Sequence, residues 1–357
     1  MKTKYANFDG MRGLAAIAVM LYHVSFYAGW PTFVHSGYLA VDLFFALSGF
    51  VIAQAYGDRL RTDMSPGRFA AIRLVRLYPL YLIGLTLGFC VFAAEALQGA
   101  PGTSLGQVMA ALGVGLFFLP IPVEIPNTSG ILPLNGPAWS LFYELGINAA
   151  YVLFLPLLTR RTLWIPIVLG ALGLGLAAIK FGSLDVGFNT YNFFGGAPRV
   201  LFSFCIGVLL YEWRPKPQQG STISVALLLA TALILAAGGR GKLHDLSIVI
   251  AVFPLLVWLG ARYQPAGRLE ACCRWLGRIS YPIYVLHLPI FFLLALNPQL
   301  LPESPALRTA AWITVLAGIV ASADVLARAY DAPVRARLSR LFGLSRPRAA
   351  AERGAAF

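Results

Sequence analysis

Long apolar runs that recur along the whole chain constrain its fold more than any other feature. At a rise of about 1.5 Å per residue, a helix of roughly 20 apolar residues crosses a hydrocarbon core of about 30 Å. Hydrophobic residues make up 58% of the 357 residues and charged residues 12%, whereas globular proteins carry about a quarter charged residues. A soluble domain of this size cannot bury so much apolar surface. The sequence therefore predicts an all-α polytopic membrane protein.

The placement of Lys and Arg indicates which apolar runs span the membrane, because cytoplasmic loops concentrate these residues. If the run at 105–120 lies re-entrant or in the interface, 23 of the 28 Lys and Arg residues fall on the cytoplasmic side. If it spans, most of the later basic loops fall outside. We therefore predict about ten transmembrane helices in the cytoplasmic (inner) membrane, with both termini cytoplasmic. These ten runs are 13–29, 38–56, 74–94, 138–158, 163–179, 198–212, 222–238, 245–261, 276–296 and 308–329.

The net charge of +13 comes from basic residues at segment ends, which fits membrane topology and does not indicate nucleic-acid binding. We expect a transmembrane domain over residues 1–332 and a basic cytoplasmic tail over 333–357 that contacts membrane lipids. The four Cys residues include no CxxC pair and predict no disulfide framework. The His residues are isolated, without HxxxH or HExxH spacing, so we expect no metal.

Ionisable residues inside apolar runs are costly, which makes them candidate functional residues. In FDGMRGLAAIAVMLYHV, Arg12 and His23 lie eleven residues apart, on one helix face and about 16 Å from each other. Asp42 and Glu144 enter from the outer side and are expected at the depth of His23. We assign His23, Asp42 and Glu144 to catalysis, with Asp42 orienting the imidazole. The alternatives are a core role for His23 and helix capping for Asp42.

Arg73 and Arg76, in RLVRLYPLY, share one helix face at the inner mouth of a span. Guanidinium groups bind phosphate well, so we assign them, with Arg12, to binding an anionic co-substrate. The alternative is ordinary cytoplasmic-side charge.

Trp139 and His287 are assigned to substrate binding. Trp139 has the alternative of an interfacial aromatic belt. His287 is flanked by Pro282 and Pro289, and its alternative is to satisfy the backbone carbonyls that prolines free.

Five stretches carry a resemblance to a known family. FDGMRGLAAIAVMLYH, YLAVDLFFALSGFVIA, RLVRLYPLYL, PAWSLFYEL and ISYPIYVLHLPI occur in that order, and together they resemble the membrane-bound acyltransferase 3 family. The resemblance implies a ten-helix core that moves an acyl group, commonly acetyl, from cytoplasmic acyl-CoA to a hydroxyl of an envelope polysaccharide, lipopolysaccharide or other carbohydrate-bearing acceptor.

The resemblance also implies roles for individual residues. Arg12 and His23 match the family's basic-x10-His motif, with His23 catalytic, as general base or as acyl carrier. Arg73 and Arg76 match the basic pair linked to the acyl donor. Many members have a second acid after the position of Glu144, where this chain has Leu145.

Two other function classes compete with this reading. A proton-coupled secondary transporter would use His23, Asp42, Glu144 and His287 as a relay, but it would favour inverted repeats, which the sequence does not show. A glycan-binding protein without chemistry would not need a basic pair opposite a buried His. The sequence leaves the oligomeric state open.

Overall fold

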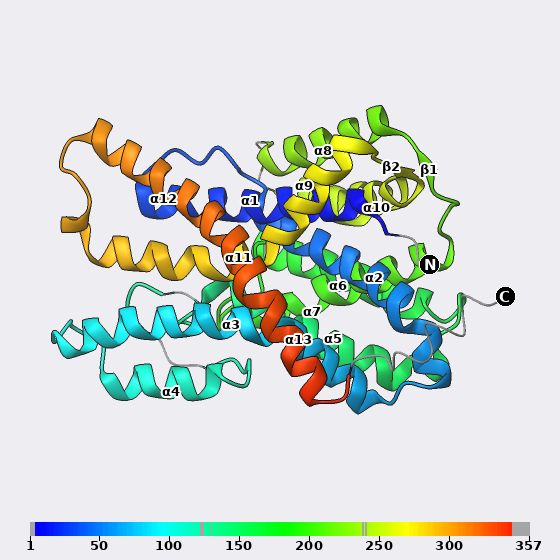
Figure 1. The fold of residues 1–357 in the computed structure, drawn as a ribbon, viewed down its shortest axis with the longest axis horizontal. Coiled ribbons are helices and arrows are strands. Elements are labelled where there is room, and N and C mark those ends of the chain that lie inside the picture. Colours follow the sequence, from blue (N-terminus) through cyan, green and yellow to red (C-terminus); the bar gives the residue numbers. More distant parts are fainter. Residues whose placement is uncertain (1–3, 122–124, 129, 238, 240, 345–357) are drawn as a thin grey trace.

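The computed structural model describes residues 4–121, 125–128, 130–237, 239 and 241–344, and in these residues the chain is almost entirely helical (Figure 1). The longer helices run roughly along the long axis of the molecule, and α12 crosses them obliquely. The helices are α1 (Ala6–Ala28), α2 (Ala40–Thr62), α3 (Pro66–Leu97), α4 (Leu105–Gly115), α5 (Trp139–Phe154), α6 (Trp164–Phe181), α7 (Gly196–Glu212), α8 (Ser221–Ala236), α9 (Lys242–Ser247), α10 (Phe253–Arg262), α11 (Gly267–Leu296), α12 (Pro305–Leu326) and α13 (Ala332–Leu341).

Short elements join or extend these helices. The 3-10 turns are η1 (Gly37–Leu39), η2 (Gly136–Ala138), η3 (Leu155–Leu157), η4 (Phe193–Gly195) and η6 (Pro298–Leu300), and the π-helical turns are η5 (Ile248–Val252) and η7 (Ala327–Asp331). Strands β1 (Gln218–Gln219) and β2 (Tyr263–Gln264) form a parallel pair, with Gln218 opposite Tyr263. The prediction of an all-α polytopic membrane protein is confirmed.

Within the described ranges, nine helical segments are long and apolar enough to cross a membrane. The remaining predicted span, 222–238, corresponds to α8, which has 16 residues and is shorter than the others. Helix α4 has 11 residues, or about 16 Å, which is too short to cross a hydrocarbon core of about 30 Å. Its placement in the interface or as a re-entrant segment stays a prediction.

Local sequence signals explain several helix ends. Pro66 occupies the first turn of α3, where its missing N–H costs no hydrogen bond, and the Ser65 side chain accepts from the Arg68 N–H at 3.3 Å. Ser104 and Gln107 form a capping box at the start of α4. Helix α1 ends at Gly29, whose φ of 66° lies in the left-handed region that glycine tolerates.

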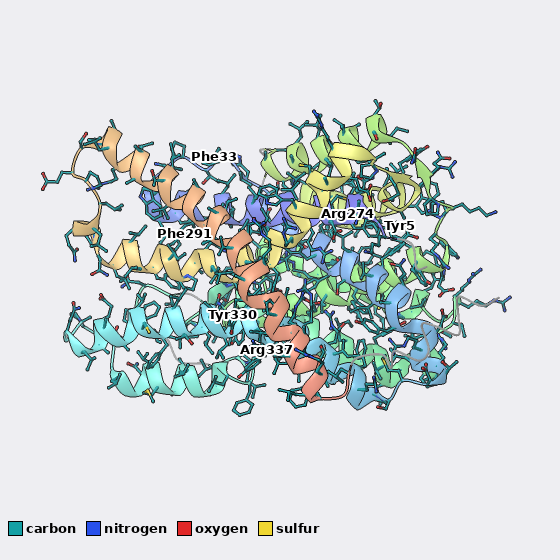
Figure 2. All side chains as sticks on the ribbon, in the orientation of Figure 1. Tyr5, Phe33, Arg274, Phe291, Tyr330 and Arg337 are labelled. Carbon is teal, nitrogen blue, oxygen red and sulfur yellow. The ribbon has the colours of Figure 1, made fainter. Side chains whose placement is uncertain are left out.

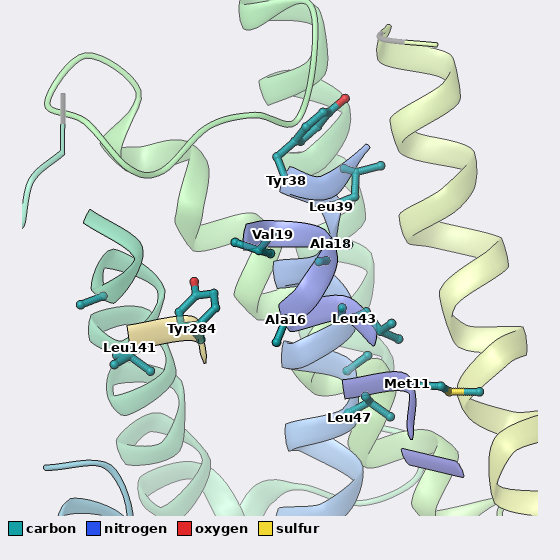
Figure 3. Close-up of a cluster of buried hydrophobic side chains, with 14 of the residues drawn as sticks. Met11, Ala16, Ala18, Val19, Tyr38, Leu39, Leu43, Leu47, Leu141 and Tyr284 are labelled. Atoms are coloured by element: carbon teal, nitrogen blue, oxygen red, sulfur yellow. The ribbon is translucent and has the colours of Figure 1, made fainter. Parts of the chain in front are cut away.

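Close approach of α2 and α7 builds the centre of the molecule. A Cβ added at Gly49 would lie 2.1 Å from the Phe204 carbonyl oxygen, and one at Gly207 would lie 2.1 Å from the Ala46 carbonyl oxygen. Small residues at these positions therefore allow the two backbones to touch. The apolar side chains around this crossing form one core that α1 and α5 share (Figure 3).

Helix α11 packs along α1 and also against α3 and α12. Side chains fill the spaces between these helices (Figure 2). Phe291 of α11, for example, packs against Trp312 of α12, with ring centroids 5.5 Å apart. Helix α6 instead presents exposed apolar side chains, which suit a lipid-facing surface. These residues are Ile165, Leu169, Leu172, Leu176 and Ile179.

The predicted tail begins as a helix that continues the last span through η7. Asp331 in this turn pairs with Arg335 in α13 at 3.2 Å. Asp324 in α12 pairs with Arg328 in η7, four residues later, and Arg278 in α11 lies 3.0 Å from the same carboxylate. Residues 345–357 of the predicted tail lie outside the described residues.

Candidate active site

Two neighbouring cavities are lined by six of the eight predicted site residues, and Asp42 and His287 line neither of them. The first, which we call the arginine cavity, has a volume of about 130 Å³ and lies between α1, α2, α3, α5 and α11. The second, which we call the histidine cavity, has a volume of about 410 Å³. The charged residues that line the arginine cavity are Arg12, Arg73, Arg76 and Glu144. The histidine cavity is lined by His23, Trp139, Asp185 and Arg199, together with aromatic and Pro/Gly residues of the outer segments.

Each arginine of the arginine cavity has an acidic partner. Arg12 donates to Asp9 at 2.9 Å, the i,i+3 pair that their spacing allows. Arg73 donates to Glu144, and Arg76 lies 3.6 Å from an Asp331 carboxylate oxygen. The three arginines therefore line one cavity, and the sequence did not indicate their acidic partners apart from Asp9.

Two buried N–H groups of this cavity have donor capacity left over. Among the described residues, the Nε atoms of Arg12 and Arg73 are buried without a hydrogen-bond partner. A buried donor without a partner is costly, so these groups favour an anionic ligand inside the cavity. The apolar residues that line the same cavity are Phe44, Phe45, Leu47, Val51, Ile52, Leu77 and Leu141.

Glu144 does not lie near His23, and that prediction is wrong. Its carboxylate accepts from Arg73 and, at 3.0 Å, from the Ser48 hydroxyl. Glu144 lines the arginine cavity, whereas His23 lines the histidine cavity. The apolar run indicated how far Glu144 lies along α5, but it did not indicate that the carboxylate turns towards Arg73 and Ser48.

His23 contacts a second imidazole. Its Nδ1 atom lies 2.9 Å from Nε2 of His287, and the two rings are nearly parallel, with an interplanar angle of 19° and centroids 5.1 Å apart. The Nδ1 atom of His287 lies 2.8 Å from the Ile283 carbonyl oxygen one turn earlier in α11. His287 is fully buried, whereas His23 is partly open to the cavity.

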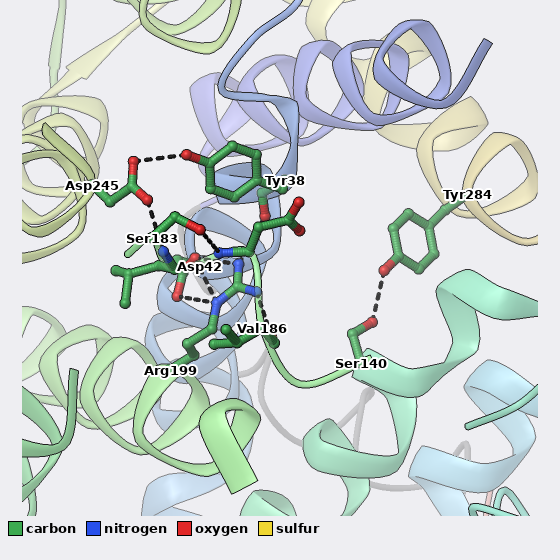
Figure 4. A network of polar contacts seen from close by, with 10 residues as sticks. Tyr38, Asp42, Ser140, Ser183, Val186, Arg199, Asp245 and Tyr284 are labelled. Carbon is green, nitrogen blue, oxygen red and sulfur yellow. Dashed lines mark hydrogen bonds and ion pairs between the residues drawn. The ribbon is translucent and has the colours of Figure 1, made fainter. Parts of the chain in front are cut away.

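The prediction that Asp42 orients His23 is also wrong, because Asp42 forms an ion pair with Arg199 (Figure 4). The Arg199 Nε donates to both carboxylate oxygens at 3.2 and 3.1 Å, and its Nη2 donates to one of them at 2.6 Å. The remaining N–H groups of Arg199 donate to the carbonyls of Val186 and Tyr38. Both charged residues are fully buried, so a bidentate pair with further hydrogen bonds is what such burial requires.

Asp42 and Arg199 belong to a larger polar network that joins the first turns of α2 and α7 to η1 and α9 (Figure 4). The Tyr38 hydroxyl donates to Asp245 at 2.8 Å, and the Leu184 N–H donates to the same carboxylate at 2.7 Å. Trp139 covers the Arg199 guanidinium, which lies 5.4 Å from the ring centroid. Trp139 is buried and lines the histidine cavity.

Tyr284 in α11 lines both cavities. Its hydroxyl donates to the Pro137 carbonyl at 2.9 Å and lies 2.8 Å from the hydroxyl of Ser140, which lines the arginine cavity. The side chain of Tyr284 is therefore shared by the walls of the two cavities, and Figure 4 shows its bond to Ser140.

Sequence reasoning missed Arg199, Tyr284 and Asp331. Arg199 lies in the first turn of α7 and was counted among the outer loop charges. The sequence did contain a hint of the ion pair, because Asp42 and Arg199 carry opposite charges and each lies near the start of an apolar run. Tyr284 carried no such signal. Within the described ranges, no group of three or more His, Cys, Asp or Glu side chains is arranged to hold a metal ion.

Comparison with known proteins decides the class to which this site belongs. A family profile described as an acyltransferase domain matches residues 5–328, nearly the whole chain. The chain belongs to the acyltransferase 3 family. It is therefore a multi-pass membrane acyltransferase that transfers groups other than aminoacyl groups, as the resemblance implied.

Several curated relatives of this acyltransferase 3 chain are similar to it over long stretches. It is 39% identical over 188 residues to "Protein 2 in picA locus" of Rhizobium radiobacter, a match of 50% of this chain and 96% of the relative. It is 27% identical to the putative membrane-bound transacylase BcsY of Komagataeibacter xylinus, over 81% of this chain and 73% of the relative.

A third relative is the peptidoglycan O-acetyltransferase OatA of Listeria monocytogenes, which is 25% identical over 80% of this chain. The match covers 49% of that relative's length. No solved structure matches the chain.

Membership of the acyltransferase 3 family argues against the transporter alternative, and the structure separates the residues of the proposed relay. Asp42 is engaged by Arg199 and Glu144 by Arg73. Only His23 and His287 of that set are in contact.

Proposed function

We propose that this chain transfers an acyl group, commonly acetyl, from acyl-CoA to a hydroxyl group of a carbohydrate acceptor of the cell envelope, such as a polysaccharide or lipopolysaccharide. Transfer to oxygen is supported by relatives that are named O-acetyltransferases. The observation that carries the proposal is the pair of cavities, one rich in arginine and one containing His23, with Tyr284 lining both.

The arginine cavity suits the acyl donor. Coenzyme A carries phosphates, and Arg12, Arg73 and Arg76 supply guanidinium groups for them. The buried Nε donors of Arg12 and Arg73 remain available for such a ligand. The apolar side chains that line the same cavity suit the pantetheine arm and the acyl group.

The histidine cavity suits the acceptor. Its volume of about 410 Å³ lies within the roughly 300–1,000 Å³ of small-molecule sites, so the cavity accommodates a sugar unit. Trp139, Tyr27 and Phe188 provide ring surfaces, and Asp185 provides a carboxylate for sugar hydroxyls. We therefore keep Trp139 as a substrate-binding residue.

His23 is the reactive group in this proposal. The acceptor hydroxyl proton passes to Nε2 of His23 while the hydroxyl oxygen bonds to the acyl carbon. The carbon–sulfur bond of the thioester then breaks, and the sulfur leaves with the proton from the imidazolium. In the acyl-carrier route, the Nε2 lone pair first bonds to the acyl carbon while the carbon–sulfur bond breaks and CoA leaves as a thiolate. The acceptor oxygen then bonds to the acyl carbon as the bond to Nε2 breaks, and the hydroxyl proton passes to the thiolate.

The distribution of charge supports an orientation in which the arginine cavity opens to the cytoplasm. With 23 of the 28 basic residues on one side, the positive-inside rule places the loops after α2, α5, α7 and α10 inside, with both termini. This orientation gives a cytoplasmic donor access to Arg73 and Arg76 and puts His23 towards the outside. The membrane in question is then the cytoplasmic membrane.

A comparison of cells with and without the gene tests the proposed function. The ester content of the envelope glycans is measured by NMR in the wild type, in a deletion strain, and in the deletion strain complemented with the wild-type chain. We expect the deletion to remove one class of O-acyl ester and the complementation to restore it. Unchanged ester content in the deletion strain contradicts the proposal.

A further inference from the structure

We propose that His287 is a positioning residue that holds His23 in the tautomer with its proton on Nδ1 and its lone pair on Nε2. The inference deepens the proposed function and rests on it only for the role of His23 as the reactive group. His287 thus takes the orienting role that the sequence analysis assigned to Asp42. Its own role changes from substrate binding to positioning.

The direction of the hydrogen bonds from His23 to His287 and from His287 to Ile283 follows from the Ile283 carbonyl group. A carbonyl oxygen can only accept, so the 2.8 Å contact with Ile283 requires a proton on Nδ1 of His287. The Nε2 atom of a neutral His287 then carries a lone pair. The 2.9 Å contact with His23 is therefore donated by Nδ1 of His23. What remains on His23 is the lone pair of Nε2, the atom that the transfer chemistry uses.

The surroundings of His287 favour its neutral form. The ring is fully buried, and its two hydrogen-bond partners are a carbonyl group and another imidazole. A second proton would make the buried His287 ring a cation. Neither of its hydrogen-bond partners is a carboxylate that could balance this charge, so the charged form is costly. The aromatic rings of Tyr284 and Phe291 pack against the imidazole, with ring centroids 6.3 Å and 5.7 Å from its own.

The structural alternative for His287 was to satisfy a carbonyl that a proline frees. Pro289 has no N–H, so it frees the carbonyl of Val285, four residues earlier. The side-chain amide of Asn135 donates to that carbonyl at 3.0 Å. His287 instead bonds to Ile283, and it is not needed for the carbonyl that Pro289 leaves open.

The tautomer can be observed directly, because the chain contains only four His residues. The full-length protein is labelled with ¹⁵N-histidine, reconstituted in lipid nanodiscs, and studied by ¹⁵N NMR, with the His23→Ala variant assigning the His23 signals. We expect a protonated Nδ1 and an unprotonated Nε2 for His23 in the wild type. A wild-type spectrum with the proton on Nε2 overturns the inference, whatever the variants do.

Variants of His287 provide a second readout, by comparing kcat and KM for acyl transfer. His287→Phe keeps a ring but removes the acceptor, and we expect kcat to fall about 100-fold, the size of an acid–base contribution, with KM within about threefold. His287→Gln keeps an acceptor oxygen, and we expect it to recover kcat to within about tenfold of the wild type. Ile279→Val, a buried change in the same helix that touches neither cavity, is the packing control.

Failure of the inference and failure of the proposed function give different results. Full kcat in a folded His287→Phe variant overturns the inference alone. If the wild type has the expected tautomer but does not transfer acyl groups from acyl-CoA, the proposed function fails while the tautomer assignment is upheld.

Discussion

The hydroxyl groups of Tyr284 and Ser140 lie 2.8 Å apart, and Tyr284 lines both the arginine cavity and the histidine cavity. An acyl group that enters through the arginines has to pass this side chain to reach His23. The size of the passage at Tyr284 should therefore limit which acyl groups are transferred.

Tyr284→Ala should broaden the range of acyl donors, because removing the ring joins the two cavities. We expect the ratio of kcat/KM for hexanoyl-CoA to that for acetyl-CoA to rise about tenfold, as expected for roughly 1–3 kcal/mol of discrimination per methylene in a restrictive pocket. The control is Tyr284→Phe, which loses the hydrogen bonds but keeps the ring. Identical donor preferences in the two variants would show that the ring does not restrict the passage.

The ion pair between Asp42 and Arg199 should contribute to stability and not to the reactivity of His23. Removing one partner of a buried pair costs on the order of 3–5 kcal/mol, because the other charge is left uncompensated. We expect Asp42→Asn and Arg199→Met each to lower the thermal unfolding temperature of the purified protein strongly. The unfolding temperature of the double variant should fall by less than the sum of the decreases in the two single variants. Normal stability with a large loss of kcat in Asp42→Asn would instead support the sequence-based role.

Arg76→Gln should weaken donor binding. Asp331 keeps its partner Arg335 in this variant, so the change removes mainly the guanidinium that faces the cavity. We expect KM for acetyl-CoA to rise about tenfold or more, because a hydrogen bond between charged groups contributes about 1.5–3 kcal/mol.

Two controls locate the effect of Arg76→Gln. Arg160→Gln removes an arginine that pairs with Glu212 and lines neither cavity, and it should leave KM unchanged. Acetyl-pantetheine lacks the nucleotide phosphates, and its KM should be the same for the wild type and Arg76→Gln. An equal rise with both donors would mean that Arg76 does not bind phosphate.

The orientation of the chain can be tested by cysteine labelling in intact cells. The exposed residues Cys90 and Cys272 are first replaced by Ser. A cysteine at Gln299 should react with a membrane-impermeant maleimide from outside, and one at Lys216 should react only after the membrane is permeabilised, because the positive-inside rule places these loops on opposite sides. The reverse labelling pattern would overturn the cytoplasmic placement of the arginine cavity.

Much of the fold could be predicted because apolar length and basic flanks are properties of contiguous sequence. The grouping of Arg12, Arg73 and Arg76 followed from the same reasoning, since each lies at one end of an apolar run. Helical spacing also gave the pair of Asp9 and Arg12.

Contacts between distant helices were not predictable in the same way. His23 and His287 are 264 residues apart in the chain, and Asp42 and Arg199 are 157 apart. Depth in the membrane placed both Asp42 and Glu144 at the level of His23, but depth does not indicate which side of a helix faces which neighbour. The close packing of α2 against α7, which glycines permit, turns Asp42 towards Arg199 and leaves His287 as the partner of His23.

Acyl transfer by the purified protein tests the central claim most directly. The wild type, His23→Ala and His35→Ala are reconstituted in liposomes with acetyl-CoA labelled in the acetyl group and a carbohydrate acceptor, and labelled ester is measured over time. His35 lines neither cavity and serves as the matched histidine control. We predict that His23→Ala lowers kcat by about 100-fold to 10,000-fold, with His35→Ala within about twofold of the wild type. Transfer by a folded His23→Ala variant at the wild-type rate would contradict the account.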